Sequence, residues 1–136
     1  MNKRKSKYTD KKLAEKAALK AMSDYVRERD EWKCITCSHT GNKHNMDCGH
    51  FIPRGYSFWR FNERNNHCQC VKCNKYEGGA WPKYYDKMCG LYGKKFVGEM
   101  IAKKHILVKR TIAEYLLIEQ YYKTKKEKLF KERKWK

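Results

Sequence analysis

The sequence predicts an α+β fold, with long helices toward both ends of the chain and a small, loop-rich centre. Between Asp10 and Glu31 apolar residues recur at helical spacing, namely Leu13, Ala14, Ala17, Ala18, Ala21, Tyr25 and Val26. From Trp32 to Asn74 this periodicity disappears, and cysteine, histidine, glycine and asparagine accumulate instead. Such a composition favours a compact centre that is organised by something other than a large apolar core.

Helical signals return in the C-terminal part of the chain. Pro82 can occupy the first turn of a short helix, and the apolar spacing over residues 96–101 indicates another. Thr111 and Glu114 have the spacing of a capping box, which predicts the start of a last amphipathic helix.

The length of 136 residues suits one domain. We expect a single domain over residues 1–136, composed of a basic leader and helix (1–31), a core (32–80) and a helical extension (81–136). The extension ends in a lysine-rich tail, which is either a DNA contact or only a solvated helix.

The chain is strongly basic. Lysine and arginine number 33 against 15 acidic residues, which gives a formal net charge of +18. That excess is larger than the charge of about 2 to 8 that suffices for solubility, so nucleic acid is the expected partner. No apolar run approaches the roughly 20 residues that cross a bilayer, and the N-terminal residues lack the apolar segment of a secretory signal. The sequence therefore predicts a cytoplasmic protein without a membrane partner.

Two Cys-x-x-Cys pairs frame the centre of the chain. Cys34 with Cys37, and Cys70 with Cys73, each offer two sulfurs from one tight turn, which is the spacing of a zinc knuckle. Together they predict a four-cysteine zinc site, which is structural because it leaves no open position for a substrate. Alternative ligand sets would draw on Cys68, Cys48 or His67.

A polar constellation lies between the two cysteine pairs. The segment from Asp47 to Arg54 predicts a short strand that carries His50 and ends at a proline; Asn65 precedes the second cysteine pair and Asn74 follows it directly. A histidine on a strand, an asparagine from the next loop and a third residue behind a zinc knuckle form the pattern of HNH (ββα-metal) nucleases. The predicted fold is thus a zinc-stapled HNH core flanked by long N- and C-terminal helices, in an HNN variant.

Phosphodiester hydrolysis explains these residue types. It needs a base that takes a proton from water, a cation that stabilises charge on the phosphate, and donors that hold the substrate in line. His50 is the candidate general base, because the ordinary pKa of histidine is near neutrality. Asn65 is expected to fix the His50 loop by local hydrogen bonds, and Asn74 to offer an amide oxygen to catalytic Mg²⁺ or Mn²⁺.

The carboxylate of that catalytic metal site has two candidates. Many HNH enzymes carry an acidic residue or a histidine immediately before the catalytic histidine, whereas this chain has Gly49 there. Glu77, three residues after Asn74, would share a helix face with it and is favoured. Asp47 would point to the opposite strand face from His50, and is the alternative if Gly49 supports a bulge.

Three stretches of the chain carry a resemblance to one family. They are Cys48 to Arg54 (CGHFIPR), Arg60 to Cys70 (RFNERNNHCQC) and the pair Cys73-Asn74. With them the sequence resembles the NinG (Rap) recombination proteins of lambdoid phages, over residues 27–93 approximately. The resemblance implies a structure-specific endonuclease that cuts branched DNA, such as Holliday junctions and D-loops, in the cytoplasm of a phage host or a lysogen. Cys73-Asn74 followed by Glu77 is also similar to phage endonuclease VII, whose metal site uses an asparagine and a glutamate.

The expected DNA contacts are basic residues around this constellation, namely Arg54, Arg60, Arg64 and Lys75. Four neighbouring aromatic residues either insert at unstacked bases or belong to the core: Tyr56, Phe58, Trp59 and Phe61. The two opposed cuts of junction resolution predict a homodimer. The alternative functions are an HNH nuclease of other specificity, such as a homing or packaging enzyme, and a zinc-ribbon protein that binds DNA without cutting it.

Overall fold

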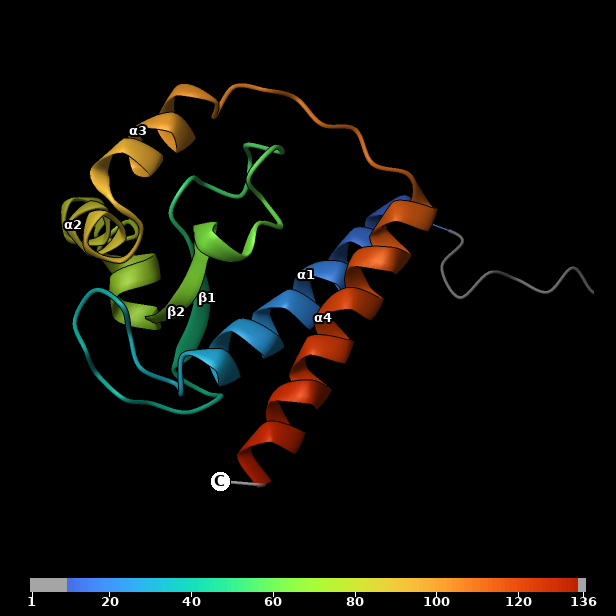
Figure 1. Cartoon of the computed structure of the whole chain (residues 1–136), viewed down its shortest axis with the longest axis horizontal. Helices are drawn as coiled ribbons and strands as arrows, with labels where there is room; N and C mark the ends of the chain where they lie inside the picture. The colour runs from blue at the N-terminus through green and yellow to red at the C-terminus, as the bar shows by residue number, and fades with distance from the viewer. Residues whose placement is uncertain (1–9, 135–136) are drawn as a thin grey trace, which may run out of the picture. The chain divides into compact units, whose positions relative to one another are not determined.

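The computed structural model describes residues 10–134, so the predicted basic leader at 1–9 and the last two residues lie outside the described part. Its elements are α1 (Lys11–Arg29), β1 (Met46–His50), η1 (Glu63–Asn65), β2 (Asn66–Cys70), η2 (Lys72–Tyr76), α2 (Trp81–Tyr92), α3 (Lys94–Ala102) and α4 (Ile112–Lys134) (Figure 1). The α+β class predicted from the sequence is confirmed, because the described residues form helices and a small two-stranded sheet. Among the described helices, none is long and apolar enough to cross a membrane.

The chain divides into two compact units. The core unit comprises Val26–Val108, and the described part of the helical unit comprises residues 10–25 together with 109–134. The core unit therefore contains both strands, α2, α3 and every residue that the sequence singles out for metal binding or catalysis. The helical unit contains α4 and most of α1.

The helix α1 is slightly shorter than the predicted range of Asp10 to Glu31. At its start the Asp10 carboxylate accepts a hydrogen bond from the backbone N–H of Lys12 at 2.8 Å, in the manner of an N-cap. At its end Glu31 and Trp32 adopt left-handed backbone, with φ of 54° and 58°, so the helix stops at Arg29.

The two strands form one antiparallel hairpin in unbroken register, from Met46 opposite Cys70 to His50 opposite Asn66. Because side chains alternate across a strand, Asp47 and Gly49 share one face of β1, and Cys48 and His50 share the other. Gly49 therefore introduces no bulge, which removes the condition under which Asp47 was expected to reach the His50 face.

The helix α2 is joined to this hairpin by the Tyr84 hydroxyl, which donates to the Gly49 carbonyl at 2.7 Å, and α3 packs against α2. Pro82 lies in the first turn of α2 as predicted, and Gly93, with a φ of 88°, separates α2 from α3. The main apolar cluster of the core unit joins the loop after β1 to these helices and consists of Phe51, Ile52, Trp59, Tyr84, Met88, Val97 and Met100. The core is small, in agreement with the loss of apolar periodicity between residues 32 and 74.

In the helical unit α4 packs along α1. The Tyr25 and Tyr122 rings have centroids 5.8 Å apart, and the Tyr115 hydroxyl donates to the Glu15 carboxylate at 3.4 Å. The predicted capping box is present, because the Thr111 hydroxyl oxygen accepts from the Glu114 backbone N–H at 3.2 Å.

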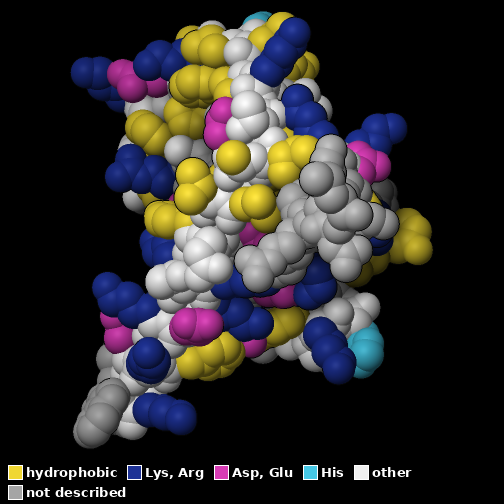
Figure 2. All heavy atoms as spheres, turned by 90° about the vertical axis from the view of Figure 1, so that its right-hand side faces the viewer, with side chains coloured by type: hydrophobic (Ala, Val, Ile, Leu, Met, Phe, Trp, Pro, Cys, Tyr) yellow, Lys and Arg dark blue, Asp and Glu magenta, His cyan; other side chains and the backbone are white. Residues whose placement is uncertain are grey.

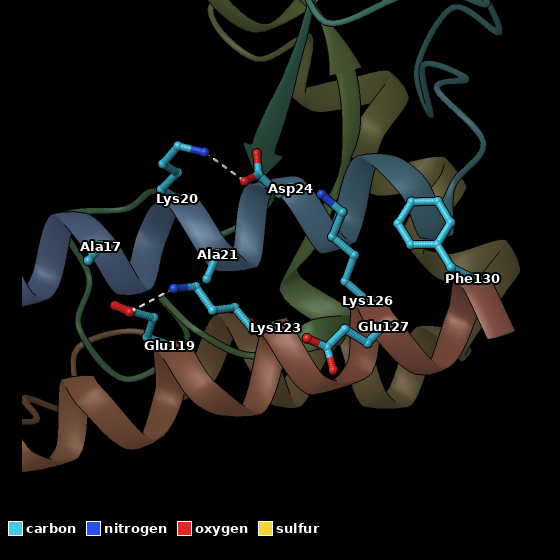
Figure 3. Close-up of a pocket in the computed structure, with 9 residues that line it drawn as sticks. All are labelled: Ala17, Lys20, Ala21, Asp24, Glu119, Lys123, Lys126, Glu127 and Phe130. Atoms are coloured by element: carbon cyan, nitrogen blue, oxygen red, sulfur yellow. Dashed lines mark hydrogen bonds and ion pairs between the residues drawn. The ribbon is translucent and has the colours of Figure 1, made fainter.

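A groove of about 450 Å³ runs between α1 and α4 (Figure 3). Its wall includes the small residues Ala17 and Ala21, and its charged lining residues form ion pairs along their own helices. Lys20 pairs with Asp24 at 2.8 Å, and Lys123 pairs with Glu119 at 3.0 Å. These pairs reduce the net positive charge of the groove, so the lysine-rich tail is partly balanced within its own unit.

The basic composition is visible at the surface. Figure 2 shows lysine and arginine side chains spread over one face of the molecule, with fewer acidic side chains between them. Hydrophobic side chains remain visible on the same face.

Candidate metal centre and active site

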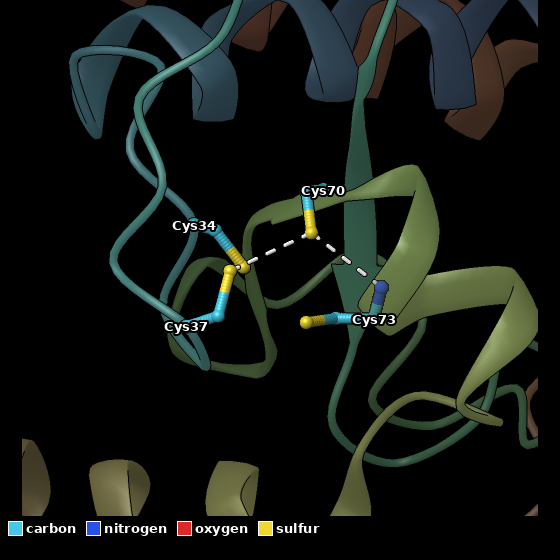
Figure 4. Close-up of side chains that lie close together, drawn as sticks. All are labelled: Cys34, Cys37, Cys70 and Cys73. Atoms are coloured by element: carbon cyan, nitrogen blue, oxygen red, sulfur yellow. Dashed lines mark hydrogen bonds between the residues drawn. The ribbon is translucent and has the colours of Figure 1, made fainter.

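The four cysteines of the two knuckles meet in the core unit (Figure 4). Their sulfur atoms all lie within 4.8 Å of one another, and the Cys37 and Cys70 sulfurs are 3.7 Å apart. A tetrahedral zinc ion with Zn–S bonds of about 2.3 Å places its sulfurs about 3.8 Å apart, so this donor set fits zinc. Within the described residues, no other cluster of His, Cys, Asp and Glu has this property, and Cys48, Cys68 and His67 stand outside it.

The surroundings of the cluster favour thiolate formation at Cys34. Burial raises the pKa of this thiol, but hydrogen bonds from Thr36 and from backbone groups outweigh it and lower the pKa from 9.0 to about 6. Thr36 Oγ1 lies 3.3 Å from the Cys34 sulfur. Since zinc binds thiolates, these hydrogen bonds favour the form of Cys34 that binds the metal.

His50 ends β1 and is half-buried. Its Nε2 lies 3.1 Å from the backbone carbonyl of Arg60. A carbonyl only accepts hydrogen bonds, so Nε2 carries the proton of the neutral imidazole, and Nδ1 is the nitrogen that can take up another proton. Burial lowers the pKa of His50 to about 4; the charges of Arg54 and Arg60 add to that effect, while the hydrogen bond to Arg60 opposes it.

Asn65 holds the loop that follows His50. It is fully buried, its Oδ1 accepts from the Ile52 N–H at 2.7 Å, and its Nδ2 donates to the Ile52 carbonyl at 3.0 Å. A third hydrogen bond joins Nδ2 to the Trp59 carbonyl at 3.1 Å. Asn65 thus clamps both ends of the loop beside His50.

Asn74 meets a carboxylate, and that carboxylate is Asp47. Asn74 Nδ2 lies 3.1 Å from Asp47 Oδ2, and the Lys75 ammonium lies 4.0 Å from the same oxygen. The Asp47 side chain is 27% exposed and the Lys75 side chain 65% exposed, so both are open to solvent. The structure brings Asp47 and Asn74 together on one side, and His50 and Asn65 together at the end of the hairpin.

Glu77 does not have the relation to Asn74 that the sequence suggests. The turn that carries Asn74 is π-helical, spans Lys72–Tyr76 and ends before Glu77, which has a φ of −103° and a ψ of 19°. The shared helix face assumed for residues three apart requires α-helical geometry through both of them. Glu77 is exposed at the end of this turn, and the preference for Glu77 over Asp47 is not supported by the local backbone.

Gln69 explains why a glycine stands before His50. A Cβ atom at Gly49 would lie 2.2 Å from Gln69 Oε1 and 2.9 Å from Gln69 Cβ. Gln69 cannot swing away freely, because its Nε2 donates to the Gly79 carbonyl at 2.8 Å and to Thr36 Oγ1 at 3.2 Å. A side chain at position 49 is therefore sterically excluded, and a carboxylate on this face of β1 has to come from Asp47.

Gly49→Ala should accordingly destabilise the core unit. We expect the free energy of unfolding of the zinc-loaded protein to fall by about 1–3 kcal/mol, as overpacking of a filled interior commonly does. The matched control is Gly55→Ala, where a Cβ atom meets nothing within 4 Å and which should be close to neutral. Urea unfolding of the two variants measures the difference, and equal stabilities would refute the steric role of Gln69.

His67, which the sequence offers as an alternative metal ligand, is instead buried in a directed hydrogen-bond chain. The Tyr84 hydroxyl donates to the Gly49 carbonyl at 2.7 Å, so its oxygen accepts from His67 Nδ1 at 3.2 Å. His67 Nε2 then accepts from the Tyr92 hydroxyl at 2.7 Å. Burial lowers the pKa of His67 to about 4. This histidine ties α2 to the hairpin, and the sequence offers no periodic signal that would have revealed the role of Tyr84.

Two of the arginines expected to contact DNA, Arg54 and Arg64, are exposed but make different contacts within the protein. Arg54 is exposed, and its carbonyl accepts from Arg60 Nε at 2.7 Å. The exposed Arg64 lies over aromatic rings, with its guanidinium 4.9 Å from the Phe96 centroid and 5.7 Å from that of Tyr92. Both arginines are accessible to a polyanion.

The fold and the site define a small α+β protein whose core unit has a cluster of four cysteines that could hold a metal ion, with a polar hairpin beside it. A family model described as "Bacteriophage Lambda NinG protein" matches residues 1–132, so the chain belongs to the NinG family, as its motifs predict. The chain is 35% identical over 112 residues to "Protein ninG" of Escherichia phage lambda. The aligned region covers 81% of this chain and 54% of that protein. It is 33% identical over 112 residues to "Protein ninG" of Escherichia phage 933W, covering 81% and 55% of the two chains.

A third relative is "Protein ninG" of Salmonella phage P22, which is 38% identical over 71 residues, or 51% of this chain and 34% of that protein. The chain spans about half the length of the first curated relatives it matches. No solved structure matches the chain.

Proposed function

We propose that this chain is a metal-dependent endonuclease that hydrolyses phosphodiesters in branched DNA, with His50 as the general base. The observation that carries the proposal is the state of His50. Its imidazole is neutral at physiological pH, its Nε2 is held by the Arg60 carbonyl, and its Nδ1 is left to take a proton from water. The hydrogen bond to Arg60 thereby holds the ring in one orientation, with Nδ1 as its proton acceptor.

Two arginines next to His50 supply the means to hold a phosphate. Arg54 and Arg60 are near enough for their charges to lower the His50 pKa, so a phosphate bound by them lies close to the base. Guanidinium groups bind phosphate oxygens through paired hydrogen bonds and keep their charge at any physiological pH. In the proposed reaction they orient the scissile phosphate, while Asn65 keeps their loop in place.

Asp47 and Asn74 are the residues that we propose hold the catalytic cation. A carboxylate with an amide beside it suits Mg²⁺ or Mn²⁺, which commonly take one or two carboxylates and complete their shell with water and substrate. Side chains alternate across β1, so a cation bound there lies on the strand face opposite His50 and would contact the DNA backbone on that side. Many HNH enzymes have their acidic residue directly before the catalytic histidine, which corresponds to position 49 in this chain. Asp47 lies two residues before that position and on the same face of β1.

The net charge of +18 supports DNA as the substrate, and the preference for branched DNA rests on the likeness to the NinG proteins. Resolution of a junction requires two opposed cuts, so we propose that two copies of the chain act together on it. Sedimentation of the protein with and without a four-way junction tests the homodimer, and a monomer in both conditions contradicts it.

Cleavage of three substrates tests the activity itself. A four-way junction, a flap and a linear duplex of equal length are incubated with the protein and Mg²⁺ or Mn²⁺. The proposal predicts cutting near the branch point and little cutting of the duplex. Equal cutting of duplex and junction would identify an HNH nuclease of other specificity, and binding without cutting on any substrate would identify a zinc-site DNA-binding protein.

Substitution of the two carboxylates separates the candidate cation sites. Asp47→Asn should reduce cleavage at low Mg²⁺ by on the order of 10²-fold and be partly rescued by higher Mg²⁺ or Mn²⁺, because it weakens cation affinity. Glu77→Gln is the matched control and should cut at the parental rate. Mn²⁺ binding measured by electron paramagnetic resonance, without DNA, should follow the same order. Loss of Mn²⁺ binding in Glu77→Gln alone would overturn the assignment to Asp47.

A further inference from the structure

The segment between α3 and α4 is anchored to the loop that follows β1. Residues 103–108 form neither strand nor continuous helix, yet the Val108 N–H donates to the buried Ser57 Oγ at 2.7 Å. The His105 ring stands edge-on to the Tyr56 ring, with centroids 5.5 Å apart, and the Lys104 ammonium lies 5.7 Å from the same ring centroid. Three separate contacts thus hold this segment against Tyr56 and Ser57 of the loop that follows β1.

Two aliphatic side chains project from this anchored segment. Leu107 is 83% exposed and Ile106 is 44% exposed. Adjacent residues of an extended chain point to opposite sides, so at a segment packed on a surface one of them is normally covered. Here both face solvent, which makes them an apolar tip on a fixed support; we call Ile106 and Leu107 the aliphatic tip.

The aliphatic tip is surrounded by positive charge. Lys103, Lys104 and His105 precede it in the chain, Lys109 follows it, and no acidic residue lies within residues 100–113. These positive charges repel a second copy of this basic chain and attract a polyanion. The partner that fits both features offers phosphates around an apolar surface, which in DNA is the face of an unstacked base pair.

We infer that the aliphatic tip inserts at the unstacked base step of a DNA branch point, while the lysines beside it contact the flanking phosphates. This inference rests on the proposed function and names the feature of the substrate that is recognised. Leucine and isoleucine side chains wedge between base steps in several DNA-bending proteins, at a cost set by the unstacking. At a branch point continuous stacking is already interrupted, so that cost is lower than in an intact duplex.

The contacts of the segment link the aliphatic tip to the proposed base. Tyr56 and Ser57, which hold the segment, belong to the loop that begins directly after His50 and is clamped by Asn65. Arg54, in the same loop, acts on the His50 pKa. An inserted tip would therefore set the distance between the branch point and the bond that is cut.

The aromatic residues considered from the sequence do not supply this wedge. Trp59 and Phe61 are buried, at 8% exposure each, and Tyr56 and Phe58 pack against the main apolar cluster. The four belong to the core or to the support of the segment. An exposed pair of aliphatic residues between lysines has no distinctive sequence pattern, which is why it was missed.

The test compares binding to a four-way junction and to a linear duplex of the same length, with 2-aminopurine placed at the branch point and no divalent metal. The double variant Ile106→Ser/Leu107→Ser should bind the junction at least about tenfold more weakly and lose the fluorescence increase of the unstacked base, with duplex affinity unchanged. Leu91→Ser, at a residue 58% exposed on α2, is the control and should behave as the parent. Lys103→Gln should weaken binding to both DNAs equally and reduce the salt slope by about 1.

The outcomes distinguish this inference from the proposed nuclease activity. A double variant that binds junction and duplex as the parent does, or that weakens both equally, overturns the inference. A double variant that sediments differently from the parent but keeps the fluorescence change marks the tip as a protein contact and also overturns it. The parental protein could bind the junction more tightly than the duplex because of the aliphatic tip, and yet cut neither DNA when Mg²⁺ or Mn²⁺ is added. That result would support the inference and refute the nuclease activity.

Discussion

Removing the zinc should unfold the core unit of this protein. Protein purified without chelator should carry one zinc per chain, bound by Cys34, Cys37, Cys70 and Cys73, whose sulfurs all lie within 4.8 Å of one another. Structural zinc sites contribute on the order of 10 kcal/mol to folding, as much as the whole stability of many small domains. The apolar core of this unit is small, so it cannot replace that contribution. Hydrogen exchange should show loss of protection in β1 and β2 when a chelator is added.

Single substitutions make the same test without a chelator. Cys73→Ala removes one of four ligands, and the core unit should then lose both its zinc and its protected amides. The control is Cys89→Ala, because Cys89 is half-buried on α2 and lies outside the cluster. Elemental analysis and hydrogen exchange on the two variants give the comparison. A Cys73→Ala protein that stays folded, or parental protein without zinc, would show that the cysteines do not form a structural zinc site.

The parts of the fold that were predictable from the sequence depend on local signals. Periodic apolar residues and a capping box placed α1 and α4, and a proline and a glycine bounded α2, because these signals act within a few residues of where they occur. The cysteine cluster was predictable as well, since metal geometry dictates ligand spacing. The division into a core unit and a helical unit has no such local signal, because α1 continues from one unit into the other.

The details of the candidate site depend on contacts between segments that no spacing rule describes. The sequence predicts a helix face shared by Asn74 and Glu77, but the turn is π-helical, and Asn74 lies 3.1 Å from Asp47 in β1. A bulge at Gly49 was the condition for Asp47 to reach the His50 face, whereas the register is regular and the glycine is required by the packing of Gln69. Both differences arise because the contacting side chain, Asp47 or Gln69, is distant in sequence from the residue it contacts, so no spacing rule points to it.

The second large effect concerns His50. Replacing it with alanine removes the proposed base, whose assistance is worth about 10²- to 10⁴-fold in rate. The zinc site and the arginines remain, so the variant should bind a four-way junction with parental affinity. Because the His50 pKa is lowered to about 4, the neutral base is present above that value and is lost as pH falls through it. The parental cleavage rate should therefore not fall between pH 7 and pH 5 as it would for a histidine with its ordinary pKa of 6.5.

Single-turnover cleavage of a four-way junction by His50→Ala is the most direct test of the account. The matched control is His44→Ala, which removes an exposed histidine of the same unit. Zinc content and thermal unfolding of both variants establish that they are folded. The account predicts parental cleavage by His44→Ala and a residual rate at or below about 1% of the parent for His50→Ala, with no rescue by added Mg²⁺ or Mn²⁺. A folded, zinc-loaded His50→Ala protein that cuts the junction at the parental rate would contradict it.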